Sequence, residues 1–187
     1  MVSGVRKLRS VIQSLLIAVL VVAGQPVSAT IPDPGDKVGC DFVTGGGWIL
    51  GSGSATSSLA AGAKANFAVG GGVKNGAFWG HLEYTDHSTS PPMKVHGTGV
   101  TDYAPGTNPN ERIIMGTARI NGVDGFTYTV EVTDYLEPGR GIDEFSISLS
   151  NGYVAGTDDG DGPIAGGNIQ LHRRNPSNTP PPGFSCA

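Results

Sequence analysis

Apolar and polar residues alternate most regularly in the last third of the chain. In FTYTVEVTD (126–134) every second residue is aromatic or valine, and the residues between them are polar. EFSISLS (144–150) and NIQLH (168–172) repeat this alternation. A period of two is typical of a strand that buries one face and exposes the other. We therefore predict antiparallel strands in all three segments.

The preceding residues predict further strands, separated by turn residues. The dipeptides Asn75-Gly76, Asn121-Gly122 and Asn151-Gly152 each lie between apolar-patterned runs, which is the strongest local signal for a hairpin. We expect an all-β fold without helices, in which a single antiparallel meander of eight or nine strands closes into a barrel-like fold. A two-sheet β-sandwich is the alternative. The additional predicted strands are DFVTGGGWIL, AKANFAV, AFWGHLEYTD, MKVHGTGVTDY, RIIMGTARI and a short one in GYVAGT.

The first 29 residues have the pattern of a secretory signal peptide. Arg6, Lys7 and Arg9 precede an unbroken apolar run at 15–23, and VSA ends the segment at Ala29. The apolar run is too short to cross a bilayer. We expect cleavage near Ala29, and a chain without an integral membrane segment that is secreted, periplasmic or attached to the cell surface.

The remaining 158 residues suit one domain. We assign a Pro-rich lead-in to 30–40, the β-domain to 41–173 and a Pro-rich surface tail to 174–187. Beyond the signal peptide the chain has nine Lys and Arg and sixteen Asp and Glu, a net charge of −7. This charge argues against nucleic acid and anionic membrane surfaces as partners.

Two cysteines, Cys40 and Cys186, flank the β-domain. In an exported protein such a pair predicts a disulfide. A metal site is disfavoured because neither cysteine belongs to a CxxC motif.

The strand AFWGHLEYTDH carries the most suggestive chemistry. Phe78, Leu82 and Tyr84 alternate with a polar set and are expected to face the core. The opposite face is a candidate ligand platform for a glycan or another cell-surface partner, and His81 and Glu83 are spaced to share a metal ion. Ordinary solvated residues on an exposed strand are the alternative. The candidate ligand-binding residues are Trp79, His81, Glu83 and His87.

Two acidic segments raise the question of calcium. TDDGDGPIAGGN matches part of an EF-hand loop and makes Asp158, Asp159 and Asp161 candidate calcium ligands, but Thr157 and Asn168 stand where acids belong. A solvated loop without a cofactor is the favoured interpretation. We interpret a second acidic set as a solvated turn; its members are Asp134, Glu137, Asp143 and Glu144.

Enzyme motifs are absent from the sequence: it contains no GxSxG, HExxH, GxxxxGK[ST] or CxxC pattern. We therefore predict that the protein is not an enzyme. An extracellular hydrolase remains an alternative, because paired carboxylates are recognised by their separation in space and not by sequence.

Six blocks together resemble a known family. VTGGGWI, GAKANFAV, GHLEYTDH, FTYTVEVTD, EPGRGIDEFSISLSNGY and GGNIQLH are similar to the post-COAP type of domain, over roughly residues 41–173. The resemblance implies a secreted or surface-associated bacterial protein with no assigned activity, and it supplies no catalytic residues. GGGVKNG departs from the family, which tends to have a longer aromatic and basic stretch there. We expect a non-catalytic domain with a binding or surface-structural role, a carbohydrate-binding or adhesive module being the first alternative.

Overall fold

A computed structural model describes residues 37–187. The predicted signal peptide and most of the predicted lead-in lie outside the described residues. Nine strands form one antiparallel sheet, as predicted for an all-β chain. The strands of this sheet are β2 (Phe42–Leu50), β3 (Lys64–Lys74), β4 (Ala77–Asp86), β5 (Met93–Pro105), β6 (Glu111–Ile120), β7 (Val123–Thr133), β8 (Glu144–Leu149), β9 (Val154–Gly156) and β10 (Gly166–His172).

The sheet is a meander from β2 to β9, but its last strand breaks the sequential order. The strand order is β10-β2-β3-β4-β5-β6-β7-β8-β9, so β10 returns to pair with β2 and does not continue beside β9. Between β9 and β10 lies a single 3₁₀ turn, η1 (Thr157–Asp159). The sheet curls into a half-barrel, which is the barrel-like fold that we expected, in one continuous sheet.

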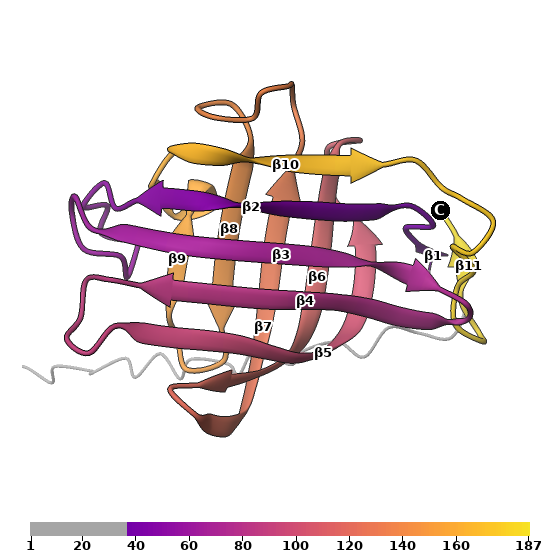
Figure 1. Ribbon diagram of the computed structural model, residues 1–187, viewed down its shortest axis with the longest axis horizontal. Coiled ribbons are helices and arrows are strands. Elements are labelled where there is room, and N and C mark those ends of the chain that lie inside the picture. The colour runs from indigo at the N-terminus through magenta and orange to yellow at the C-terminus, as the bar shows by residue number, and fades with distance from the viewer. Residues whose placement is uncertain (1–36) are drawn as a thin grey trace, which may run out of the picture. The chain divides into compact units, whose positions relative to one another are not determined.

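The curl occurs in β5, the longest strand. Its first part, Met93–His96, pairs with β4, whereas pairing with β6 runs from Val95 to Pro105, so the strand leaves β4 after His96. Register shifts fall between Gly97 and Gly99 and again between Val100 and Asp102. Such bulges bend a strand. As a result β10, β2, β3 and β4 form one layer, and β6 to β9 cross behind it (Figure 1).

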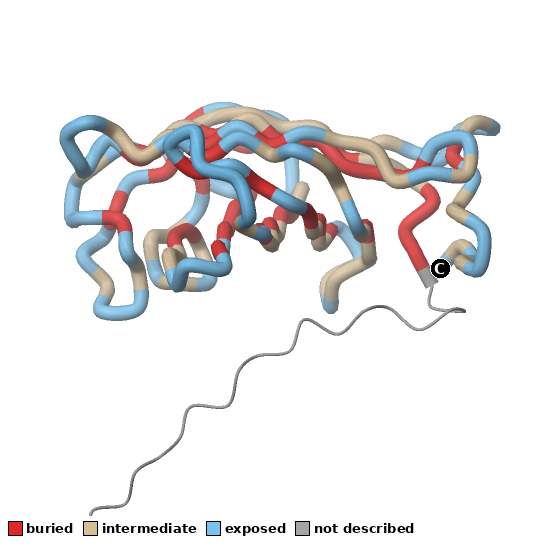
Figure 2. The backbone as a smooth tube through the Cα atoms, turned by 90° about the horizontal axis from the view of Figure 1, so that it is seen from below, coloured by how far each residue is buried: buried red, intermediate tan, exposed pale blue. Residues whose placement is uncertain are grey.

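The core lies between these two layers. Phe67 of β3 stacks on Phe145 of β8, with ring centroids 4.0 Å apart. Both layers are buried where they face each other (Figure 2). The predicted inward residues are buried, with the exception of Phe78, Phe126 and Leu171, which are partly exposed. The buried members are Tyr128, Val130, Val132, Phe145, Ile147, Leu149 and Ile169.

Other segments of the chain cover both edges of the sheet. One of them contains Asp143, whose sequence-based interpretation was wrong. Asp143, which we interpreted as part of a solvated turn, is completely buried, and its Oδ2 accepts a hydrogen bond from Ile169 N on the free edge of β10 at 2.9 Å. Asp134 Oδ2 accepts another from Leu171 N at 2.7 Å. Ser58 covers the free edge of β9 by donating from N to Val154 O at 2.7 Å. Edge strands are thus closed to pairing with another chain.

The two ends of the described chain meet, as the cysteines predicted. Cys40 and Cys186 form a disulfide. Beside it β1 (Lys37–Val38) and β11 (Ser185–Cys186) pair in parallel. The Pro-rich tail lies largely at the surface, but Asn178 within it is buried and donates from Nδ2 to Val73 O at 2.7 Å. The tail packs on the sheet because its one buried amide completes the hydrogen bonding at the end of β3.

Candidate functional site

The outer side of β10, β2, β3 and β4 gathers planar side chains from strands that are far apart in sequence. It is the side of the front layer that faces the viewer in Figure 1. One row across the sheet consists of His172, Phe42, Gly72 and Trp79 in register. We call this side the ring face, and its planar members are Phe42, Trp48, Trp79, His81 and His172.

Three of these rings lie over glycines of a neighbouring strand. A Cβ atom added to Gly72 would lie 3.1 Å from Trp79 Nε1, and one added to Gly70 would lie 3.0 Å from His81 Cε1. One added to Gly166 would lie only 2.2 Å from Trp48 Cζ2. The absence of a side chain lets each ring lie down on the sheet. Both tryptophans are accordingly half-buried.

Polar groups surround the rings. His172 stacks on Phe42 with centroids 4.4 Å apart, and a 2.8 Å hydrogen bond joins its Nε2 to Thr44 Oγ1. Trp79 Nε1 is buried and has no hydrogen-bond partner among residues 37–187. At the other end of β4, His87 Nε2 lies 3.0 Å from Asn66 Oδ1. The ring face therefore places polar groups between flat apolar surfaces.

The four residues predicted from the β4 sequence lie on or directly beyond this face, but they are not arranged as a metal site. Glu83 Oε1 is joined to His96 Nδ1 of β5 at 2.5 Å, so the carboxylate is paired across strands and not with His81. Trp79 is half-buried, in agreement with the predicted outward register, and His87 is exposed. In the described part of the chain no group of three or more His, Cys, Asp or Glu side chains is arranged to hold a metal ion.

Sequence reasoning missed the contribution of β2 and β10. Phe42, Thr44 and Trp48 alternate with the inward residues of β2, so their common face was readable from the period of two. The position of β10 beside β2 was not readable, because a distant strand can pair with any free edge.

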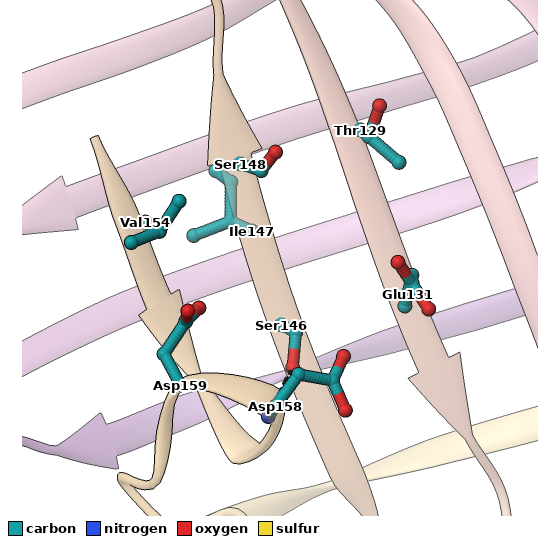
Figure 3. A pocket seen from close by; sticks show the side chains of 8 residues that line it. All are labelled: Thr129, Glu131, Ser146, Ile147, Ser148, Val154, Asp158 and Asp159. Carbon is teal, nitrogen blue, oxygen red and sulfur yellow. Dashed lines mark hydrogen bonds between the residues drawn. The ribbon is translucent and has the colours of Figure 1, made fainter. Parts of the chain in front are cut away.

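A second candidate site lies on the outer side of β7, β8 and β9. It is a cavity of about 250 Å³, which we call the acid pocket. Figure 3 shows side chains of these strands and of η1 around it. The acid pocket is lined by Thr129, Glu131, Ser146, Ile147, Ser148, Val154, Asp158 and Asp159.

The structure separates the three predicted calcium ligands. Asp158 and Asp159 line the acid pocket. Asp161 instead accepts hydrogen bonds from Ser57 Oγ at 2.5 Å and from the backbone N–H of Ser52 and Gly156 at 2.9 and 3.0 Å. Its carboxylate fastens the β2–β3 loop to the end of β9.

Two carboxylic acids of the acid pocket, Glu131 and Asp159, have a raised pKa. Burial raises the pKa of Glu131, and the neighbouring charges of Asp158 and Glu111 raise it further. Burial and the charge of Asp158 likewise raise the pKa of Asp159. Carboxylic acids with a raised pKa inside a cavity are a common feature of functional sites. Here they are surrounded by hydroxyl groups and can donate or accept hydrogen bonds.

No helix among residues 37–187 is long and apolar enough to span a membrane. No known protein-family model matches the chain, and neither a curated protein nor a solved structure is similar enough to be matched with it.

Proposed function

We propose that this protein is an exported, non-catalytic domain that binds glycans on its ring face. The observation that carries the proposal is the placement of Trp48, Trp79 and His81 on glycines, which turns three rings into a flat platform. Sugar rings have flat C–H faces that pack on aromatic rings, and aromatic side chains contribute large contact areas at little entropic cost.

The polar groups between the rings support a glycan over a purely apolar ligand. Thr44 and Gln170 are in register with each other and with His81 on Gly70. Their hydroxyl, amide and imidazole groups match the alternating donors and acceptors of sugar hydroxyls. The predicted signal peptide and the resemblance to post-COAP-type domains agree with a place outside the cell, where such polymers occur.

A glycan array combined with a broad hydrolase screen tests the proposal. We expect specific binding without turnover. Trp79→Ala should abolish binding and lower the free energy of unfolding by about 1 kcal/mol or less, whereas truncation of a fully buried tryptophan costs about 3 to 5 kcal/mol.

Tyr135→Ala is the matched control, because Tyr135 is an exposed aromatic residue in the β7–β8 loop, outside the ring face. It should bind as the unmodified protein does. Equal binding by the unmodified protein and Trp79→Ala would overturn the proposal, and turnover would remove its non-catalytic part.

A hydrolase acting in the acid pocket is the second candidate function. Its supporting observation is the raised pKa of Glu131 in a cavity shared with Asp158 and Asp159, an arrangement suited to a general acid beside a carboxylate. If the screen finds turnover, Glu131→Gln should abolish it. Trp79→Ala should leave the rate of turnover unchanged, because Trp79 does not line the acid pocket.

A further inference from the structure

We infer that the glycan bound by the ring face is an acidic chain, carrying carboxylate or sulfate groups that are met by Lys64 and Lys74. This inference rests on the proposed function and adds the chemical class of the ligand. It comes from the positions of the cationic side chains relative to the two tryptophans.

The two lysines occupy equivalent positions at the two ends of β3. Lys64 is in register with Leu50, two residues beyond Trp48, and Lys74 is in register with Ala77, two residues before Trp79. Each lysine is thus the diagonal neighbour of a tryptophan, a relation that spans about 7 to 8 Å and is within reach of long side chains. At one end the contact is formed, with Lys64 Nζ 4.5 Å from the centroid of the Trp48 ring. A ligand ring on either tryptophan would have an ammonium group beside it.

Neither of these lysines forms an ion pair within the described structure. The ion pairs among residues 37–187 join His96 to Glu83, Arg112 to Asp41 and Arg119 to Asp124. None of them includes Lys64 or Lys74, which are the exposed lysines of this layer. Unpaired surface cations remain available to an external anion.

Charge is also divided between the two sides of the molecule. Glu83 is the one carboxylate that β10, β2, β3 and β4 direct outward, and it is joined to His96. The outer side of the other layer holds the acidic residues of the acid pocket together with Glu111 and Glu144. An acidic protein that carries Lys64 and Lys74 on one face attracts anions there, because complementary charge sets where a ligand approaches.

The spacing of the lysines indicates a polymer. Ten residue steps of β3 separate Lys64 from Lys74, which is about 33 Å at the usual rise of a strand. This exceeds the Debye length of about 8 Å at physiological salt, so each lysine acts on a separate part of the ligand. A single sugar cannot reach both, and affinity should therefore increase with chain length.

The flatness of the ring face favours an acidic polysaccharide over an anionic lipid surface. Trp48 and Trp79 lie down on glycines, so they do not project as the aromatic residues of membrane-inserting segments must. The acidic remainder of the protein would also repel an extended anionic membrane, whereas a single polysaccharide chain contacts the ring face alone.

The test compares matched polymers that differ in charge. Polygalacturonate and heparin are measured beside methyl-esterified polygalacturonate and desulfated heparin, with vesicles of phosphatidylcholine and phosphatidylserine as the lipid arm. We expect tighter binding of at least one polymer than of its less charged counterpart, weakening with added salt. Lys64→Gln and Lys74→Gln should each weaken that binding roughly two- to fivefold at low salt and leave the melting temperature unchanged.

Arg140→Gln is the control, since it removes an exposed cation from the β7–β8 loop. It should not change binding. Equal binding of each polymer and its less charged counterpart that still requires Trp79 would overturn the inference and leave the proposed function standing. A preference for vesicles would overturn the inference in favour of lipid. Failure to bind any glycan on the array or in this panel would overturn the proposed function itself.

Discussion

The two outer sides of the curled sheet are built from the same kind of strand and are nevertheless opposite in character. On the ring face, Trp79 and His81 lie across Gly72 and Gly70 of the adjacent strand. On the outer side of β7 and β8 the cross-strand partners are hydroxyl residues, such as Thr129 opposite Ser148. A large planar side chain can lie flat only where its neighbour lacks a Cβ atom. The residue on the neighbouring strand therefore decides whether a ring can lie flat on the sheet or whether polar side chains project from it.

The two sides also differ in how their charges are compensated. Glu83 on the ring face has His96 as a partner at 2.5 Å. Glu131 in the acid pocket has mainly other carboxylates as neighbours, and its pKa is raised. A paired carboxylate supports the fold, whereas a crowded one works against the fold when it is ionised.

Removal of the disulfide should have the largest effect on stability. Cys40 and Cys186 are separated by 146 positions, so their bond closes a long loop in the unfolded chain. The double substitution Cys40→Ser with Cys186→Ser should lower the free energy of unfolding by about 3 to 5 kcal/mol, as measured by denaturant melts.

The same variant sharpens the comparison of the two sides. Cys40 packs with Val73 and Phe78, at the end of the sheet that carries Trp79. Amide exchange at the β3–β4 turn should therefore accelerate more than amide exchange in β8. Equal acceleration in both regions would contradict the view that the disulfide locally supports the ring face.

Gly72→Ala should have an intermediate effect. The new Cβ would lie 2.7 Å from Phe42 Cβ and 3.1 Å from Trp79 Nε1, so the two rings must move apart or lift. Overpacking of this kind costs about 1 to 3 kcal/mol. Glycan binding should fall by about tenfold or more if the flat position of Trp79 forms the platform.

Gly99→Ala is the control for this substitution, because its Cβ would meet only Thr117 Oγ1 at 3.6 Å. It should leave both stability and binding nearly unchanged. If Gly72→Ala bound glycan as well as the control did, the glycine beneath Trp79 would have no role in recognition.

Glu131→Gln should have the smallest effect and the opposite sign. Because the folded pKa of Glu131 is raised, ionisation at neutral pH destabilises the fold, and glutamine removes that penalty. The free energy of unfolding should increase at pH 7, by less than about 1 kcal/mol after solvent screening. The gain should shrink as the pH falls through the raised pKa and vanish below about 4.3, where unfolded glutamate is protonated as well.

Glu83→Gln is the corresponding test on the ring face. It should not increase stability at pH 7, because Glu83 has a partner in His96. Thermal melts of both variants across pH 4 to 8 measure the difference. A stabilising Glu83→Gln would show that the contrast between the two sides is not electrostatic.

Local sequence signals predicted much of the fold. The dipeptides Asn75-Gly76 and Asn121-Gly122 form hairpin turns with positive φ at both residues, as their composition required. The alternation in β4 predicted correctly that Leu82 and Tyr84 are buried and that Trp79 faces outward. These features were predictable because they depend on neighbours within a few residues or on the period of the strand.

The burial of Asp143 could not be predicted in this way. Its carboxylate accepts hydrogen bonds from Tyr135 N and Ile169 N, and the second partner is 26 positions away. In the sequence it is one acid among several in a turn that contains proline and glycine. Only the docking of that turn on β10 supplies the donors that make burial of a charge tolerable.

The sequence by itself determined the strands of the large sheet, the Asn-Gly hairpin turns, the buried face of the regularly alternating strands and the pairing of its two cysteines. These follow from local backbone preferences, from the period of two, and from having two cysteines in a chain that carries an export signal pattern. The tertiary structure alone decided that β10 lies beside β2, and thereby that His172 stacks on Phe42 and that Gly166 lies under Trp48. The reason is physical: a free sheet edge accepts any strand with a matching face, so the partner is chosen by the packing of the whole domain. The ring face exists because that choice brought glycines and rings of separate strands into register.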